Sequence, residues 1–307
     1  MSIPIPSTCK QAFPRLFYNN LSNVEDVLSR NSVELVFLLE TNLSSIKKLK
    51  KECASALLSR SSFVASSLPT FNHFSFGCNF LNSYVNNVFY PGSLFEICGK
   101  AGSGKTQLCY QLLVSNLHPS DSHSIYIKTE GDFSADRINH LATSKGVAND
   151  IDRILLQECG SLEDLEQSVY ESIPLFLETG SISVLIIDSI AGVCRGSTIT
   201  NRSTRLSQLT LALKRLSFRH LIPIFIVNQV TDVTVGSDSV TIPFMGMSWS
   251  YQINHRLMIH RDHEVVLHRN LTGSASSNAR KAILDSNGLS LEFNLHVGDT
   301  GVTGTLQ

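Results

Sequence analysis

Gly99-Lys100-Ala101-Gly102-Ser103-Gly104-Lys105-Thr106 decides the fold, because it fits the G-x4-G-K-[ST] pattern of a phosphate-binding loop. The apolar run 93–98 before it is typical of a buried strand, and residues 106–114 after it have helical spacing. A strand, a glycine-rich loop and a helix bring backbone N–H groups and a helix N-terminus around phosphate oxygens. The stretch therefore predicts a nucleoside triphosphate site. A glycine-rich turn that binds nothing is the alternative.

Two side chains of this loop are expected to contact the ligand directly. Lys105 should reach the β- and γ-phosphates, and the Thr106 hydroxyl should ligate Mg²⁺. We include Gln107, the next residue, in the expected nucleotide site.

Composition indicates a globular protein with a sizeable core. The chain has 307 residues, of which 42% are hydrophobic and 17% charged, and its net charge is −1. Any contact with nucleic acid must therefore come from local basic patches. Seven scattered cysteines without a C-x-x-C pair favour reduced thiols and an intracellular location. The sequence shows no signal peptide, and no apolar stretch approaches 18 residues, so no membrane contact is expected.

The pattern along the chain predicts three parts. Residues 1–60 are expected to form a loose, proline-containing arm (1–15) and a small helical domain with about three short helices over 22–60. Residues 61–73 are rich in serine and predict a linker. Residues 74–307 are expected to form the core.

The core pattern predicts an α/β fold. Apolar strands alternate with helical stripes, which is typical of a mostly parallel sheet flanked by helices on both faces. The strands are expected at 124–129, 153–159, 184–188 and 223–228, and the helices at 134–143, 162–176 and 206–216. After residue 253, short strands predict an antiparallel extension near the C-terminus, at 256–260, 265–268, 280–284 and 289–293.

Three polar residues follow strands of this predicted sheet. Asp188 ends the apolar run 184–188, where a second Mg²⁺ carboxylate belongs, since ligands lie at the carboxyl ends of parallel strands. Glu130 follows the strand 124–129 and is a candidate base or water-orienting group. Gln229 follows the next strand and has an amide that can sense the γ-phosphate. A helix cap, a solvated acid and an ordinary strand end are the respective alternatives.

Four segments together resemble the RecA superfamily, specifically the eukaryotic strand-exchange recombinase and its paralogs. The segments are Gly104-Lys105-Thr106-Gln107-Leu108-Cys109, Thr129-Glu130-Gly131, Leu185-Ile186-Ile187-Asp188-Ser189 and Val227-Asn228-Gln229-Val230. They argue against a kinase or a small GTPase. Residues 39–45, 75–78 and 245–256 are most similar to the paralog subfamily that includes X-ray repair cross-complementing protein three.

The resemblance implies a RecA-like P-loop ATPase core and a role for each motif residue. Lys105, Thr106 and Asp188 would bind MgATP, and Arg137 would pack on the adenine. Glu130 would be the catalytic carboxylate, assisted by Lys105. Gln229 would couple the nucleotide state to the DNA-binding loops.

The first of these loops should carry the DNA contact. It follows Asp188 and contains Arg195, Arg202 and Arg205 among small residues, which suits binding to backbone phosphates. A solvated surface loop is the alternative. The second loop, roughly 231–245, contains acidic residues and no Lys or Arg, which counts against full strand-exchange activity.

Phe63 lies in the linker and resembles an aromatic residue that inserts into a neighbouring recombinase core. The alternative is a linker hydrophobe that packs on its own core.

The resemblance implies a nuclear, ATP-dependent accessory factor of homologous recombination and double-strand break repair. Its expected partners are single-stranded or junction DNA, another recombinase paralog in a hetero-oligomer, and the recombinase filament. It implies a DNA-stimulated ATPase that forms ADP and phosphate, although paralogs often turn over slowly. The alternatives are a self-assembling strand-exchange recombinase and a scaffold that does not hydrolyse ATP.

Overall fold

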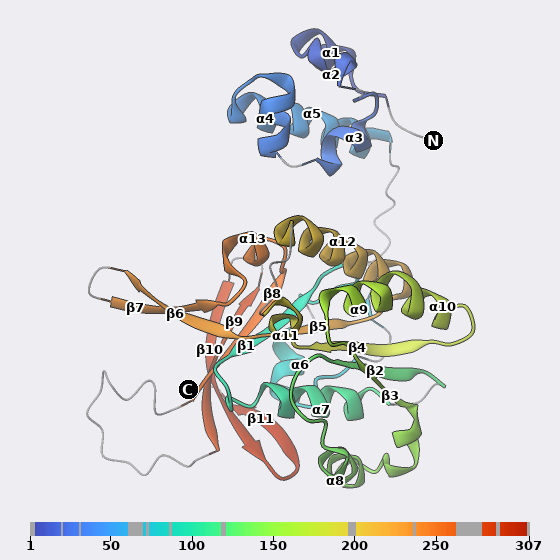
Figure 1. Ribbon diagram of the computed structural model, residues 1–307, viewed down its shortest axis with the longest axis vertical. Helices are drawn as coiled ribbons and strands as arrows, with labels where there is room; N and C mark the ends of the chain where they lie inside the picture. Colours follow the sequence, from blue (N-terminus) through green and yellow to red (C-terminus); the bar gives the residue numbers. More distant parts are fainter. Residues whose placement is uncertain are drawn as a thin grey trace. The chain divides into compact units, whose positions relative to one another are not determined.

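The computed structural model describes residues 4–19, 21–30, 32–60, 70–71, 74–85, 88–117, 121–195, 201–235, 238–261, 278–286 and 289–305. The chain divides into two compact units, the N-terminal unit Met1–Leu68 and the core unit Pro69–Gln307 (Figure 1). The division falls within the expected linker 61–73. Residues 61–69, 72 and 73, which include Phe63, lie outside the described residues, so the linker and its partner-binding role stay predictions.

The N-terminal unit is a small helical bundle. Its helices are α1 (Ser7–Ala12), α2 (Arg15–Tyr18), α3 (Val24–Ser29), α4 (Ser32–Leu39) and α5 (Leu43–Arg60). The last three confirm the helices predicted over 22–60. Their apolar side chains pack into one core that includes Val27, Leu35, Ile46 and Leu49.

The prediction of a loose N-terminal arm is wrong for residues 4–15. Ile5 and Cys9 belong to the same core and are only 3% and 1% exposed. Pro6 immediately precedes α1, where its φ of −51° is compatible with entry into a helix. Proline is compatible with the residue before a helix as well as with a loose arm, and Pro6 takes the first of these roles.

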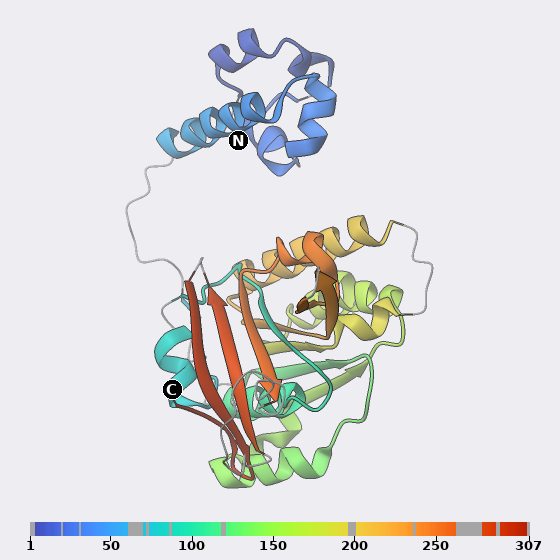
Figure 2. The same ribbon diagram turned by 90° about the vertical axis from the view of Figure 1, so that its left-hand side faces the viewer.

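The core unit is built on a nine-stranded sheet in the order β11-β10-β9-β8-β1-β5-β4-β2-β3. Its parallel strands are β1 (Phe95–Gly99), β2 (His123–Lys128), β3 (Ile154–Glu158), β4 (Ile182–Asp188), β5 (Ile224–Asn228) and β8 (His255–Arg261). The antiparallel strands β9 (Ala279–Ser286), β10 (Leu289–Gly298) and β11 (Gly301–Thr305) extend one edge (Figure 2). The predicted fold class is confirmed.

Helices cover both faces of this sheet (Figure 1). One face packs on α6 (Asn79–Val85), α7 (Lys105–Ser115) and α8 (Ala135–Lys145), which is followed by the short 3-10 helix η1 (Ala148–Arg153). The other packs on α9 (Leu162–Gln167), the π-turn η2 (Ser168–Ser172), α10 (Ile173–Phe176), α11 (Ile190–Cys194) and α12 (Arg202–His220). Because the central strands are buried on both faces, their sequences are almost continuously apolar.

Two elements differ from the expectation. Much of the expected second loop, 231–245, is a β-hairpin of β6 (Val230–Val235) and β7 (Asp238–Pro243), followed by α13 (Gly246–Ser250). The strand β11 was not predicted. The strand expected at 265–268 lies outside the described residues.

Candidate nucleotide site

The bend between β1 and α7 has a backbone that requires glycine. Gly102 and Gly104 have φ values of 70° and 106°, in the left-handed region that other residues rarely adopt. A Cβ on Gly102 would also lie 1.7 Å from the Arg261 guanidinium. The Ser103 hydroxyl oxygen is buried and has no hydrogen-bond partner among the described residues. A buried polar atom without a partner is uncommon and calls for a ligand or a functional reason.

Lys105 is the first residue of α7, and its side chain turns back over the bend. Its Nζ donates to the carbonyl oxygens of Gly99 (2.8 Å) and Lys100 (2.9 Å). Burial lowers the pKa of Lys105, and the nearby Asp188 carboxylate opposes this effect. A partly desolvated ammonium group at a helix N-terminus is well suited to bind an anion.

Asp188 is the last residue of β4 and lies beside the bend, within hydrogen-bond distance of Thr106. Its Oδ2 accepts hydrogen bonds from the Tyr126 hydroxyl (2.6 Å) and the Thr106 hydroxyl (3.1 Å). Burial raises the pKa of Asp188, whereas these two hydrogen bonds lower it. Burial also raises the pKa of Tyr126, so the phenol remains a donor. The arrangement joins the Thr106 hydroxyl and a carboxylate oxygen, which are the ligand types that Mg²⁺ prefers.

Glu130 binds three other groups at the cleft. Its Oε1 accepts from the Ser189 hydroxyl (2.7 Å) and from the Gln229 amide (2.8 Å). Its Oε2 forms an ion pair with Arg195 at 3.1 Å. The tips of three strands and the start of the expected DNA loop therefore converge on one carboxylate.

These side chains line an open cleft of about 380 Å³. The structure thus brings together seven of the residues expected at the nucleotide site, namely Ala101, Gly102, Lys105, Thr106, Glu130, Asp188 and Gln229. The cleft is lined by Ala101, Gly102, Lys105, Thr106, Tyr126, Glu130, Gly131, Asp132, Asp188, Ser189, Val227 and Gln229. Tyr126 and Ser189 were missed by the sequence analysis. Ser189 directly follows Asp188, which was the only available signal, while Tyr126 reads as an ordinary strand residue.

Arg137 is not among the residues that line this cleft. Its Nε donates to the Gln107 side chain (2.7 Å), and its two terminal nitrogens donate to the carbonyl oxygens of Gly298 and Asp299 (2.6 Å each). Arg137 therefore joins α7 and α8 to the β10–β11 turn. Its expected contact with adenine stays a prediction.

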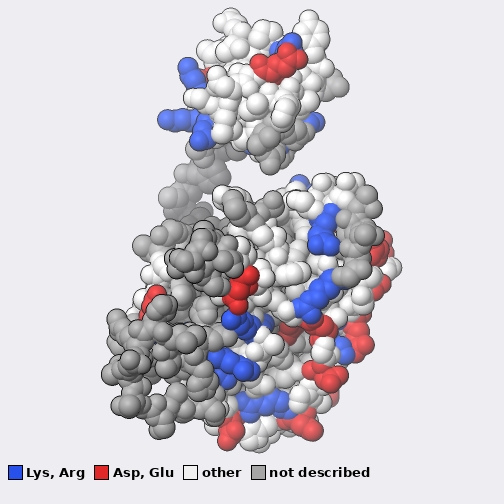
Figure 3. Space-filling view, turned by 60° about the vertical axis from the view of Figure 1, so that its left-hand side comes forward, with Lys and Arg blue, Asp and Glu red and all other residues white. Residues whose placement is uncertain are grey.

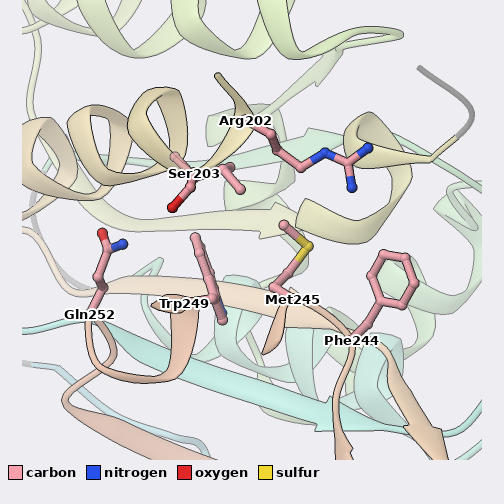
Figure 4. A pocket seen from close by; sticks show the side chains of 7 residues that line it. Arg202, Ser203, Phe244, Met245, Trp249 and Gln252 are labelled. Carbon is pink, nitrogen blue, oxygen red and sulfur yellow. The ribbon is translucent and has the colours of Figure 1, made fainter. Parts of the chain in front are cut away.

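The three arginines expected to bind DNA have different surroundings. Arg205 forms a bidentate pair with Glu166 (2.9 and 2.6 Å) and a further bond to Glu163 (2.7 Å). Arg202 lines a second, smaller pocket of about 190 Å³ (Figure 4). Residues 196–200 of this loop lie outside the described residues. On the face of the core unit in Figure 3, basic and acidic side chains lie close together.

The comparisons with known proteins agree with this geometry. The model of the Rad51 family matches residues 71–290. The chain belongs to the Rad51 family. This assignment confirms the resemblance to the eukaryotic recombinase and its paralogs, and members of the family generally bind ATP with Mg²⁺.

Individual relatives of this Rad51-family protein are distant. The chain is 29% identical to "DNA repair protein XRCC3" of Bos taurus over 213 residues, which cover 61% of this chain and 62% of the relative. It is 26% identical to "DNA repair protein RAD51 homolog 3" of Dictyostelium discoideum over 213 residues, covering 59% and 55%. It is 25% identical to "DNA repair protein XRCC3" of Mus musculus over 285 residues, covering 80% and 81%. The matches to the first two relatives thus span less than two thirds of the length of those relatives. The predicted similarity to the XRCC3 subfamily is confirmed.

Two further observations concern the Rad51-family chain as a whole. All seven cysteines are buried and free. Within the described ranges, no helix combines the length and the apolar character needed to cross a membrane.

Proposed function

We propose that this protein is an ATP-dependent, DNA-binding accessory factor of homologous recombination and DNA double-strand break repair. It acts in the nucleus, in a hetero-oligomer with another recombinase paralog, and it assists recombinase filaments or processes junctions. The observation that carries the proposal is the cleft in which Lys105, Thr106, Glu130, Asp188 and Gln229 converge. The names of the relatives, which are DNA repair proteins, support the biological context.

The residues of the cleft fit MgATP. Gly102 and Gly104 adopt the left-handed conformation that is typical of backbone anion-binding bends, and the Ser103 hydroxyl is buried without a described partner. Lys105 and the N-terminus of α7 would bind the phosphates, and Thr106 and Asp188 would hold the Mg²⁺. The bound nucleotide and metal would supply the phosphoanhydride bond to be cleaved and the positive charge that polarises it.

The remaining polar residues would perform the proton and coupling steps. Glu130 accepts hydrogen bonds and can orient a water molecule or take its proton. Gln229 donates to Glu130, so a change at the amide alters the position of the carboxylate. Arg195, from the first DNA loop, holds the other oxygen of Glu130. This contact offers a physical route by which DNA binding would stimulate hydrolysis.

Replacing Lys105 by alanine tests the nucleotide site. Lys105→Ala should weaken MgATP binding by about 10- to 100-fold, because a charge-assisted hydrogen bond is worth roughly 1.5–3 kcal/mol. Equilibrium binding of a fluorescent ATP analogue measures the effect, and Lys10→Ala at an exposed position of α1 is the matched control. Equal affinity of wild type and Lys105→Ala would exclude this cleft as the nucleotide site.

A further inference from the structure

A second carboxylate, Glu96, is fully buried inside the core unit at 0% exposure. It is the second residue of β1, three residues before the phosphate-binding bend begins at Gly99. Its Oε1 accepts hydrogen bonds from the Asn228 amide (2.8 Å) and the Trp249 indole N–H (2.6 Å). Its Oε2 is paired with Arg256 on β8. A buried charge is tolerated only when it is paired and hydrogen-bonded, and here donors from three different elements meet that condition.

On one side, Glu96 is connected to the candidate nucleotide cleft. The Asn228 side-chain oxygen accepts a hydrogen bond from the backbone N–H of Gln229 at 2.8 Å. The Gln229 side chain in turn donates to Glu130. A continuous series of hydrogen bonds therefore runs from the carboxylate at the cleft, through the end of β5, to the buried carboxylate of β1.

On the other side, Glu96 is connected to the second pocket. Trp249 is 2% exposed and forms part of the wall of this pocket, between Met245 and Gln252 in Figure 4. Phe244 lines the same pocket, and its backbone N–H donates to the carbonyl oxygen of Gln229 at 2.8 Å. Gln229 is thus bonded to the pocket wall twice, directly through Phe244 and indirectly through Asn228, Glu96 and Trp249.

We propose that Glu96 is a positioning residue that couples the nucleotide cleft to the pocket walled by Trp249 and Phe244. This inference rests on the proposed function, because MgATP is the ligand expected to change the hydrogen bonding of Gln229. When Gln229 exchanges its bond to Glu130 for one to a phosphate oxygen, Asn228 follows the movement of its neighbour. Glu96 then adjusts, and the Trp249 indole moves with it.

Asn228 and Trp249 share one acceptor oxygen on Glu96, and this shared oxygen can couple their movements in a way that simple packing cannot. Asn228 and Trp249 donate to the same oxygen of Glu96, so a displacement of one donor changes the geometry available to the other. Apolar side chains of the same size would fill the space without this directional dependence. Energetic coupling between two sites requires a physical network of this kind, and it must be demonstrated by measuring one site while changing the other.

The chain provides its own probe, because Trp249 is its only tryptophan. The emission maximum and acrylamide quenching of the full-length protein are measured with and without MgATP, and nucleotide binding is measured separately by equilibrium dialysis. In wild type, MgATP should change the Trp249 emission. In Asn228→Ala, which leaves the bonds from Trp249 and Arg256 to Glu96 intact, MgATP should still bind, but the change in emission should be clearly smaller than in wild type, because only the direct bond through Phe244 remains.

Glu96→Gln is the second variant. A glutamine amide has only one acceptor oxygen, so in either orientation its NH₂ group faces at least one of the donors Arg256, Asn228 and Trp249. This variant should shift the Trp249 emission before any ligand is added and should reduce the response to MgATP. Glu292→Gln on the exposed side of β10 is the control with the same change of charge and should behave as wild type. If Glu96→Gln does not fold, Asn228→Ala decides the question.

The outcomes separate this inference from the proposed function. If MgATP binds to wild type and the Trp249 emission is unchanged, the coupling is refuted while the nucleotide site stands. If Asn228→Ala responds to MgATP as wild type does, the path through Asn228 and Glu96 is refuted. If no nucleotide binds to wild type, the proposed function fails, and the coupling fails with it.

Discussion

At the residue scale, Glu130 must be accessible to water and yet is held in place by several hydrogen bonds, and these two requirements oppose each other. A carboxylate that orients water needs an accessible oxygen, but both oxygens of Glu130 accept bonds from Ser189, Gln229 and Arg195. These contacts fix the position of the side chain and limit its access to water. Removal of Arg195 from Glu130 by DNA would therefore raise the activity of the site, which is how we propose that DNA stimulates hydrolysis.

The substitution Glu130→Gln tests this role. It keeps the size of the side chain but removes the charge and the basicity, so hydrolysis should fall by about 10²- to 10⁴-fold, the usual contribution of a general base. MgATP affinity should change little, because the phosphate contacts come from the bend and from Lys105. Single-turnover hydrolysis with saturating DNA measures the effect, and Glu158→Gln at the end of neighbouring β3 is the control. Hydrolysis at the wild-type rate would remove Glu130 from the mechanism.

The second prediction at the residue scale concerns His255 and the dependence of folding stability on pH. Burial and, to a lesser extent, nearby Lys214 lower the pKa of His255 to about 4. Its Nδ1 lies 2.8 Å from the Ser286 hydroxyl oxygen. The unfolded chain has a histidine pKa near 6.5, so the unfolded state binds more protons between these values. The neutral ring therefore stabilises the fold fully above about pH 6.5, and this contribution is lost as the pH falls toward 4.

The expected size of the His255 effect is up to about 3 kcal/mol over this pH range. The free energy of unfolding of His255→Phe should depend less steeply on pH between 4 and 6.5 than that of wild type. Urea denaturation monitored by Trp249 emission measures both curves, and His140→Phe at an exposed position of α8 is the control. Parallel curves for wild type and His255→Phe would contradict the assignment.

At the element scale, Gln111 connects α7, the helix that follows the phosphate-binding bend, to β11, the last strand, by hydrogen bonds. Its Nε2 donates to the carbonyl oxygens of Phe76 (3.0 Å) and Val302 (2.9 Å), and its Oε1 accepts from the Val302 N–H (2.6 Å). Because all these groups are buried, Gln111→Leu would leave backbone groups of β11 without partners. The variant should lose about 2–4 kcal/mol of unfolding free energy, since each buried unsatisfied group costs roughly 1–3 kcal/mol. Urea denaturation of this variant and of the exposed control Gln167→Leu measures the difference.

The same contact explains why some elements could be predicted and others could not. The central strands and α7 follow from continuous apolar runs and from the glycine pattern, which are local signals. The strand β11 has the sequence Gly-Val-Thr-Gly-Thr, with neither an apolar run nor clear alternation. It pairs with β10 and is held by Gln111, 191 residues away from Val302 in the sequence. Tertiary contacts therefore determine its structure.

In the candidate site, too, some features could be predicted from the sequence and others could not. Asp188, Glu130 and Gln229 could be predicted to converge, because each follows a strand and the carboxyl ends of parallel strands meet at one edge. The hydrogen bond from Tyr126 to Asp188 depends on how β2 and β4 are paired, and the pairing register is not visible in either strand alone. The buried Glu96 was also missed, since a single acid in an apolar strand gives no sign of its partners.

At the scale of the whole molecule, charge limits the DNA binding that we propose for this protein. The net charge is −1, and basic side chains of the core unit pair with acidic ones, as Lys100 does with Asp232 (3.1 Å). Binding to phosphates is driven by the release of counterions and grows with the number of cations that reach the backbone. DNA affinity should therefore come from a few side chains near the first loop, and its dependence on salt should be shallow.

A comparison of arginine variants tests which side chains these are. The double variant Arg195→Ala/Arg202→Ala should lower the affinity for single-stranded DNA and reduce the slope of log affinity against log salt by about 1.4, or roughly 0.7 for each lost phosphate contact. Arg205→Ala should leave the slope nearly unchanged, because Glu163 and Glu166 already bind its guanidinium group. Fluorescence anisotropy with a labelled oligonucleotide at several KCl concentrations measures all three slopes. If Arg205→Ala flattens the slope as much as the double variant does, DNA displaces both glutamates, and their ion pairs with Arg205 exist only in the DNA-free state. If no variant changes the slope, the phosphate contacts lie elsewhere on the protein.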